Sequence, residues 1–369
     1  MNKQSSKSSR SATSASAPAG RASFARLVSH LIPAFGLAML AGALGGLLLG
    51  ESASPLLTAL LPLKTAHANT IYNTDRLTFS AGDNHACGIR NGALYCWGDN
   101  SYGQSGTGGT TTPVPNMTSG VTAVDAGEHH TCAIRNGALL CWGLNSSGQL
   151  GDGTTTNRTT PVTVTGMTSG VTAVDAGSYH TCAIRNGALY CWGNNSYGQS
   201  GTGGTTTPVP NMTSNVVAVA AEGGHSCAIR NGALLCWGGG GWSGPGGSYG
   251  SIPPWGSVPV TVSGMVNGVT NVTAGHWSVC AIRNGGVSCT SSIGNGLGNT
   301  ISALSTNVTA VASGGWNNAF ACAVRNGAVF CWGTNYSSHS APTAMPAPLN
   351  ADVLAVSAFR HGGQAIFSP

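Results

Sequence analysis

The chain has 369 residues, 56 of them glycine, and only 7% are charged, against about 25% in an ordinary soluble domain. Six basic residues and one acid before residue 69 account for the whole net charge of +5, because the remainder carries nine arginines, nine acids and no lysine. A neutral body without lysine argues against nucleic-acid binding, which depends on neutralising phosphates, and against recruitment to an anionic membrane.

Residues 1–68 resemble an export segment. A Ser-rich basic start is followed by an apolar stretch, Leu31–Gly50, and by the small-x-small sequence Ala66-His67-Ala68. These are the parts of a secretory signal, so we expect cleavage after Ala68. The alternative is an uncleaved anchor, because Leu31–Gly50 is long enough to span a bilayer. Both alternatives export residues 69–369 as one secreted or cell-envelope domain.

One unit is repeated through this domain. The sequence Cys-Ala-Ile-Arg-Asn-Gly-Ala-Leu or a close variant begins at six cysteines spaced 45, 50, 45, 53 and 42 residues apart. Each copy follows a strand-like stretch such as Val121–Gly127 and precedes a loop rich in Gly, Asn and Thr. Short β-rich units at this period predict an all-β fold, a β-propeller. A seventh unit begins at Val353, so we expect seven blades, with six as the alternative.

The Asn-Gly step within each unit predicts a two-residue hairpin turn. Counting outward from such a turn places the two cysteines of each unit opposite one another, with Cα atoms about 4.5 Å apart. The register therefore predicts six disulfides, typical of an oxidising compartment. The predicted pairs are Cys87–Cys96, Cys132–Cys141, Cys182–Cys191, Cys227–Cys236, Cys280–Cys289 and Cys322–Cys331.

Zinc is the competing interpretation of these cysteines. A histidine stands two residues before the first cysteine of four units, at His85, His130, His180 and His225. A histidine and two cysteines would give three ligands per blade, but no fourth ligand recurs. We therefore predict no metal and no cofactor, and we expect these histidines to pack at a fixed place in each blade.

The order Ala-Gly-x-x-His-Thr-Cys-Ala-Ile, Asn-Gly-Ala-Leu, Cys-Trp-Gly-x-Asn, Gly-Gln-x-Gly, Pro-Val over residues 77–335 resembles the regulator of chromosome condensation repeat family. The resemblance implies a seven-bladed propeller, often closed by pairing of the two chain ends, for which residues 70–80 are available. The eponymous member is a nucleotide exchange factor for a small GTPase and binds chromatin, roles that suit an exported neutral chain poorly. Secreted bacterial relatives include an inhibitor of β-lactamase.

Six copies of Arg-Asn-Gly predict a ring of arginines on one face. We interpret them as solvated turn residues paired with local backbone or with acids such as Asp125 and Asp175, and an anion-binding ring is the alternative. Gly246–Gly250 matches the Gly-x-Ser-x-Gly nucleophile pattern, but it lies in a Gly-rich loop without the strand-to-helix elbow that this motif needs. No pair of carboxylates breaks the repeat, so we predict no catalytic residues and no enzyme.

Aromatic residues break the symmetry of the repeat in its second half. We expect them to contact a protein or glycan partner, since exposed aromatics on a rigid scaffold are typical of binding sites. The predicted function is a non-enzymatic binding module. The alternatives are a structural surface protein and an inhibitor of an extracellular enzyme, and a hydrolase or an exchange factor is less favoured. The predicted binding residues are Trp242, Tyr249, Trp255, Trp277 and Trp316.

Overall fold

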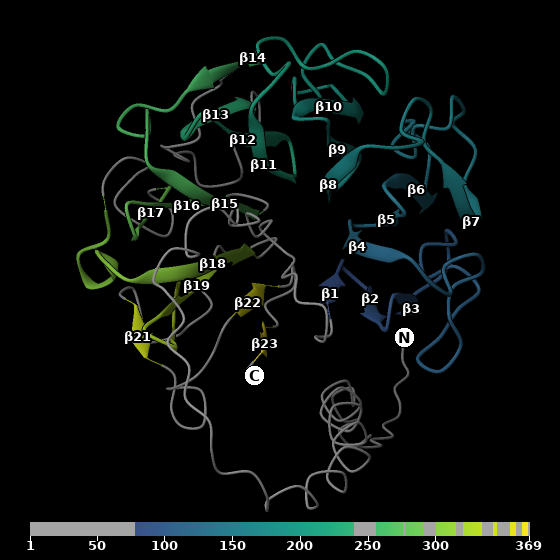
Figure 1. Cartoon of the computed structure of the whole chain (residues 1–369), viewed down its shortest axis with the longest axis horizontal. Coiled ribbons are helices and arrows are strands. Elements are labelled where there is room, and N and C mark those ends of the chain that lie inside the picture. The colour runs from purple at the N-terminus through teal and green to yellow at the C-terminus, as the bar shows by residue number, and fades with distance from the viewer. Residues whose placement is uncertain are drawn as a thin grey trace, which may run out of the picture. The chain divides into compact units, whose positions relative to one another are not determined.

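The chain folds as a β-propeller of seven antiparallel sheets, which follow one another in chain order around a centre (Figure 1). The sheets are the blades, and the first strands of successive blades lie side by side. The computed structural model describes residues 78–239, 256–275, 278–290, 300–314, 320–333, 342–344, 355–358 and 364–367. The all-β class and the seven-bladed architecture are therefore confirmed.

Blades one to six each contain a first strand followed by a two-stranded hairpin. The first strands are β1 (Thr78–Ala81), β4 (Val121–Ala126), β8 (Val171–Ala176), β11 (Val216–Glu222), β15 (Val269–Gly275) and β18 (Val308–Gly314). The hairpins are β2 (His85–Arg90) with β3 (Ala93–Gly98), β5 (His130–Arg135) with β6 (Ala138–Gly143), β9 (His180–Arg185) with β10 (Ala188–Gly193), β12 (His225–Arg230) with β13 (Ala233–Gly238), β16 (Ser278–Arg283) with β17 (Gly286–Cys289), and β19 (Phe320–Arg325) with β20 (Ala328–Gly333).

The remaining elements differ between blades. A fourth, outer strand is present in blades two, four and six: β7 (Arg158–Thr163), β14 (Gly256–Thr261) and β21 (Thr343–Ala344). A short 3-10 helix, η1 (Ser302–Leu304), precedes β18, and the described part of blade seven is β22 (Ala355–Ala358) paired with β23 (Gln364–Phe367).

The hairpin register is the one predicted from the Asn-Gly turns. In blade one, Asn91 and Gly92 both have positive φ, 52° and 74°, and the same pair of signs recurs in all six hairpins. Each pair of cysteines lies directly opposite, with Cα atoms 4.0–4.1 Å apart. All twelve cysteines form the six predicted disulfides. Six disulfides indicate an oxidising environment.

The hydrophobic core lies between blades rather than within one sheet. One cluster joins the disulfide of blade one to Val124, Ala133 and Trp142 of blade two, and the corresponding residues repeat this packing around the molecule. Because each blade buries its faces against its neighbours, the stability of one blade depends on the next.

The prediction for the start of the ring was wrong for the residues that can be tested. Residues 70–80 were expected to pair with the last blade, but β1 pairs with β2, and Ser80 lies opposite Cys87 as Asp125 lies opposite Cys132. This stretch is the first strand of blade one. Residues 70–77 lie outside the described part.

Within the described residues, no helix has both the length and the apolar character needed to cross a membrane. The predicted export segment, residues 1–68, lies outside them, so cleavage after Ala68 and the alternative anchor at Leu31–Gly50 stay predictions.

Candidate binding faces

The propeller has two faces with different chemistry. The hairpin face is formed by the six Asn-Gly turns. The loop face is formed by the turns between the first and second strands and by the loops that leave the third strand of each blade. On the loop face these two kinds of segment are joined by backbone hydrogen bonds within a blade, as between Leu144 N and His129 O (2.9 Å).

Side chains hold the loops of the loop face in one conformation. In blade three, the Asn195 side chain accepts from Ser200 N (3.0 Å) and donates to Gly201 O (2.6 Å). The Gln199 side chain accepts from Tyr197 N (2.9 Å). These contacts explain why Asn and Gly-Gln recur in the loops, because both side chains satisfy backbone groups that the turn leaves unpaired.

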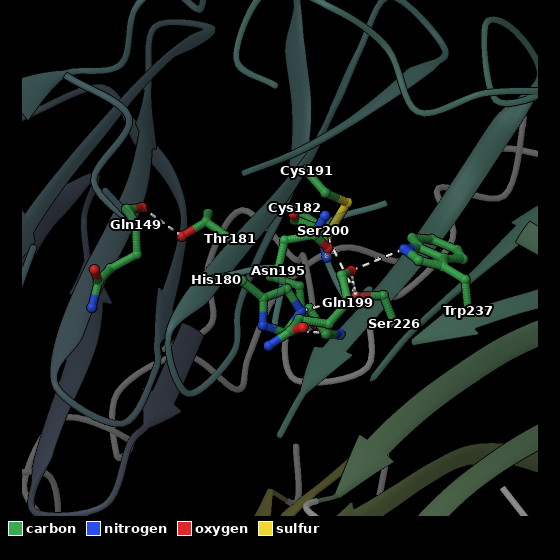
Figure 2. The surroundings of a disulfide bond; sticks show 12 residues. Gln149, His180, Thr181, Cys182, Cys191, Asn195, Gln199, Ser200, Ser226 and Trp237 are labelled. Carbon is green, nitrogen blue, oxygen red and sulfur yellow. Dashed lines mark hydrogen bonds between the residues drawn. A yellow bond between two sulfur atoms is a disulfide. The ribbon is translucent and has the colours of Figure 1, made fainter. Parts of the chain in front are cut away.

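The same loop connects its blade to the next one. Figure 2 shows that Gln199 O accepts two hydrogen bonds from blade four, from Ser226 Oγ (2.8 Å) and from Trp237 Nε1 (2.9 Å). His180 Nε2 lies 2.9 Å from Ser226 Oγ. Since the single hydroxyl hydrogen is donated to Gln199 O, the histidine must be the donor, with its proton on Nε2.

This junction recurs between other blades. Gln149 O accepts from Thr181 Oγ1 (2.8 Å) and Trp192 Nε1 (3.0 Å), while His130 Nε2 lies 2.9 Å from Thr181 Oγ1. His85, His130, His180 and His225 are all buried. The expectation that these histidines pack at a fixed place is confirmed. Glycine stands three residues before His85, His130 and His180, because a Cβ atom on Gly127 would lie 2.5 Å from Gly177 O and 2.8 Å from the His130 ring.

Asp125 and Asp175 also connect blades, and their predicted pairing with the hairpin arginines was wrong. Both side chains are buried on first strands. Asp125 accepts from Ser80 Oγ (2.9 Å) of blade one and from Ala176 N (2.6 Å) of blade three. Asp175 accepts from Ala221 N (3.0 Å) of blade four. These carboxylates serve the interior, because a buried carboxylate needs hydrogen-bond donors.

Three tyrosines are exposed on the loop face. Tyr102, Tyr179 and Tyr197 are 38%, 37% and 37% exposed. The Tyr102 ring lies 5.0 Å from the ring of His129 in blade two, centroid to centroid, and His129 Nε2 lies 3.4 Å from the Glu128 carboxylate. Tyr102 and Tyr197 belong to loops of identical sequence, residues 100–119 and 195–214, in blades one and three.

The arginines of the hairpin face have fixed positions. Nε of Arg135, Arg185 and Arg230 donates to the carbonyl of Ser119, Ser169 and Ser214, at 3.2 Å in each case. Arg283 and Arg325 repeat the contact at 3.0 and 3.1 Å. Arg90 instead lies over the Tyr95 ring, 5.1 Å from its centroid. The predicted pairing with local backbone is thus confirmed for five of the six.

The predicted binding residues lie outside the described part of the chain, and so does the Gly246–Gly250 sequence. The exposed tyrosines were not predicted, although Tyr-Gly-Gln recurs in two loops, a signal that the sequence offers. No group of three His, Cys, Asp or Glu side chains suited to a metal occurs among the described residues. The predicted binding residues that lie outside the described part are Trp242, Tyr249, Trp255, Trp277 and Trp316.

Repeated blades, an Asn-Gly hairpin in each of six blades and side-chain junctions between neighbours define a repeat-built β-propeller. Two models of the regulator of chromosome condensation (RCC1) repeat match the chain, one over residues 136–184 and 186–229, the other over 78–104, 121–149 and 171–199. These segments, in blades one to four, are therefore repeats of the RCC1 type.

Solved structures agree on the fold. Human WBSCR16 is 18% identical, with a TM-score of 0.62, over 81% of this chain and 88% of that protein. Prp20p from Saccharomyces cerevisiae is 16% identical, with a TM-score of 0.58, over 79% of this chain and 82% of that protein. At these identities the likeness concerns the fold alone. The comparison with curated proteins found no match.

Proposed function

We propose that the propeller is a non-enzymatic protein-binding module that acts after export into an oxidising compartment. The observation that carries the proposal is the set of three exposed tyrosines on the loop face, Tyr102, Tyr179 and Tyr197. Tyrosine is enriched at protein interfaces because it buries a large ring while its hydroxyl keeps a hydrogen-bond partner. The loops of Tyr102 and Tyr197 are already ordered by Asn and Gln side chains, so binding through them would cost little conformational entropy.

Two further points support the proposal, one on the partner and one on the compartment. Prp20p shares the fold, and its structure was reported together with its binding to Gsp1p and histones. A propeller of this kind can therefore present a face to other proteins. The six disulfides favour action outside the reducing cytosol. The aromatic residues predicted from sequence, Trp242, Tyr249 and Trp255 in one loop with Trp277 and Trp316, are proposed as additional contacts for the same partner.

The test begins with capture of partners on the immobilised propeller from the extracellular medium of cells that make it. Each captured protein is then purified, and its affinity is measured by calorimetry for the wild type and for the triple variant Tyr102→Ala, Tyr179→Ala, Tyr197→Ala. We expect affinity to fall about thirtyfold, as for loss of an interface hot spot.

The matched control is Arg135→Gln, Arg185→Gln, Arg230→Gln, which changes three residues of the opposite face and is expected to leave this affinity unchanged. A tyrosine variant that binds as tightly as the wild type would refute the loop-face proposal. Loss of affinity in Trp242→Ala, Tyr249→Ala, Trp255→Ala but not in the tyrosine variant would move the site to the loop predicted from sequence.

A further inference from the structure

We propose that the hairpin face is a second binding surface, which takes an extended acidic polypeptide segment with a carboxylate at every third residue. The first argument is the segregation of charge. Six of the seven arginines that the structure describes stand at hairpin tips, while the seven described acids lie in the interior or in segments of the loop face. These acids are Asp83, Asp99, Asp125, Glu128, Asp152, Asp175 and Glu222.

Segregation gives a neutral body one strongly positive face. In each of the six described hairpin turns the arginine is followed by Asn and Gly, so these turns contain no acid that would neutralise the arginines. A face with a single sign of charge attracts an oppositely charged partner over a distance of about 10 Å at ordinary ionic strength. The surface is thus suited to a ligand that carries several negative charges.

The second argument is that backbone hydrogen bonds join the tips into one belt. Gly92 O in the first tip accepts from Val121 N (3.0 Å), and Gly120 O accepts from Asn136 N (2.9 Å) in the second tip. The same pair of bonds recurs from tip to tip through Asn326 of blade six. The arginines are therefore held on one face at regular intervals.

The belt also sets the spacing of the charges. Two hydrogen-bonded steps separate neighbouring tips, and each step between adjacent extended segments is about 4.8 Å, so the backbones of neighbouring tips are about 10 Å apart. A polyproline II segment rises about 3.1 Å per residue with three residues per turn. It therefore presents every third side chain on one side at intervals of about 9 Å, close to the interval of the hairpin tips that carry the arginines.

The third argument is the chemistry of each arginine. In five blades Nε is occupied by a backbone carbonyl, which fixes the plane of the guanidinium group, as for Arg135 with Ser119 O. The two Nη groups at the end of this side chain match the two oxygens of a carboxylate. In two blades one Nη group also has a partner within the protein, since Arg283 Nη2 donates to Asn267 Oδ1 (3.2 Å) and Arg325 Nη1 to Ala303 O (3.1 Å).

The experiment uses a fluorescein-labelled peptide of six Glu-Pro-Pro repeats and the full-length exported protein at low ionic strength, with binding followed by fluorescence anisotropy. We expect saturable binding that weakens as salt is added. The variant Arg135→Gln, Arg185→Gln, Arg230→Gln removes three neighbouring charges and is expected to bind about tenfold more weakly. The tyrosine variant of the loop face is expected to bind the peptide as the wild type does.

Several outcomes would overturn the inference. One is the absence of binding by the wild type, and another is equal binding by the glutamine variant. A peptide with the same number of glutamates in one block that binds as tightly would refute the spacing. The substitutions Arg135→Lys, Arg185→Lys, Arg230→Lys keep the charge, so unchanged binding would refute the role of the fixed guanidinium groups. Tighter binding of a polyuronate or of single-stranded DNA at the same arginines would refute the polypeptide class.

Folding of each variant is checked by its far-ultraviolet circular dichroism and its melting temperature. If the triple variant fails to fold, the three single glutamine variants replace it, and each is expected to weaken peptide binding about twofold. Because the loop-face tyrosines are measured in parallel, failure of this inference is distinct from failure of the proposed function.

Discussion

At the scale of single residues, the repeated loops show where one copy lacks a contact that the others have. The Gln104 and Gln199 side chains donate from Nε2 to Asp99 Oδ2 (2.9 Å) and Asn194 Oδ1 (3.1 Å). In blade two the corresponding acceptor is replaced by Leu144, and Gln149 Nε2 is buried without a hydrogen-bond partner. A buried donor without an acceptor costs about 1–3 kcal/mol.

Leu144→Asn supplies this acceptor but removes a buried leucine, so we expect its free energy of unfolding to be about 1 kcal/mol higher than that of Leu144→Ala. The measurement is denaturant unfolding followed by fluorescence. Leu144→Ala is the matched control, because it removes the leucine without adding an acceptor, and it is expected to lower stability. Equal effects of the two substitutions would contradict the account of Gln149.

The blade-one loop has an acid whose ionisation stabilises it. Hydrogen bonds from Ser101, first from its side chain and then from its backbone N–H, outweigh the effect of burial and hold the pKa of Asp99 below its usual value of 3.8. A carboxylate with a lowered folded-state pKa stabilises the fold above its unfolded pKa, and this contribution is lost as the pH falls below about 4. The loop of blade one should therefore weaken in acid.

Asp99→Asn places at this position the residue that blade three already has, Asn194. We expect the variant to fold normally at pH 7 and to lose less stability than the wild type between pH 5 and about pH 2, because one titrating group is gone. The melting temperature across this range is the measurement. Identical acid dependence in the two proteins would show that Asp99 makes no contribution. Asp152 is a second acid-sensitive group, present in both proteins. Burial raises its pKa, but hydrogen bonds from Thr154, Arg158 and Asn145 outweigh burial, so the pKa lies below its usual value.

At the scale of the blade, the junctions between neighbours are the contacts most open to a direct test. Thr181 Oγ1 donates to Gln149 O (2.8 Å) and accepts from His130 Nε2 (2.9 Å). Thr181→Val keeps the shape but removes the acceptor of His130 Nε2 and one of the two donors to Gln149 O, which keeps the bond from Trp192 Nε1 (3.0 Å). We therefore expect a loss of about 1–3 kcal/mol in unfolding free energy. Chemical denaturation measures the loss.

The matched control for this junction is Thr181→Ser, because Ser226 makes the same contacts in blade four. The serine variant is expected to stay within about 0.5 kcal/mol of the wild type. A valine variant as stable as the serine variant would mean that the hydroxyl contributes nothing to the joining of blades.

These junctions also show why part of the structure could be predicted and part could not. The hairpins and all six disulfides follow from local rules, because an Asn-Gly turn fixes the register of Cys182 against Cys191. The contact of His180 with Ser226 spans 46 residues and joins two sheets, and no local rule supplies it. The repeat does indicate a fixed role for the histidine. Tyr102 and Tyr197 were missed because binding residues were expected where the repeat is broken, whereas these tyrosines belong to its regular copies.

At the scale of the whole molecule, the two faces differ in charge, and the state of the disulfides shows whether the protein has reached an oxidising compartment. The twelve sulfurs are buried or nearly so, with none more than 2% exposed. Reduction of the folded protein therefore requires opening of the cores between blades. A protein that reaches an oxidising compartment should keep all six bridges when a reductant is added without denaturant.

Intact mass measurement of the unreduced protein, isolated from the cells that make it, tests both export and the formation of the six disulfides. Each bridge removes two hydrogens, so six bridges predict a mass lower by twelve hydrogens than that of the reduced chain. A first residue at Asn69 would fit cleavage after Ala68, while the full N-terminus would fit an anchor at Leu31–Gly50. Alkylation before and after unfolding in reductant distinguishes buried bridges from accessible thiols. Free thiols together with an intact N-terminus would contradict export. The partner would then have to be sought in a reducing compartment, because disulfides are not maintained there. The protein-binding face would still be available in that compartment.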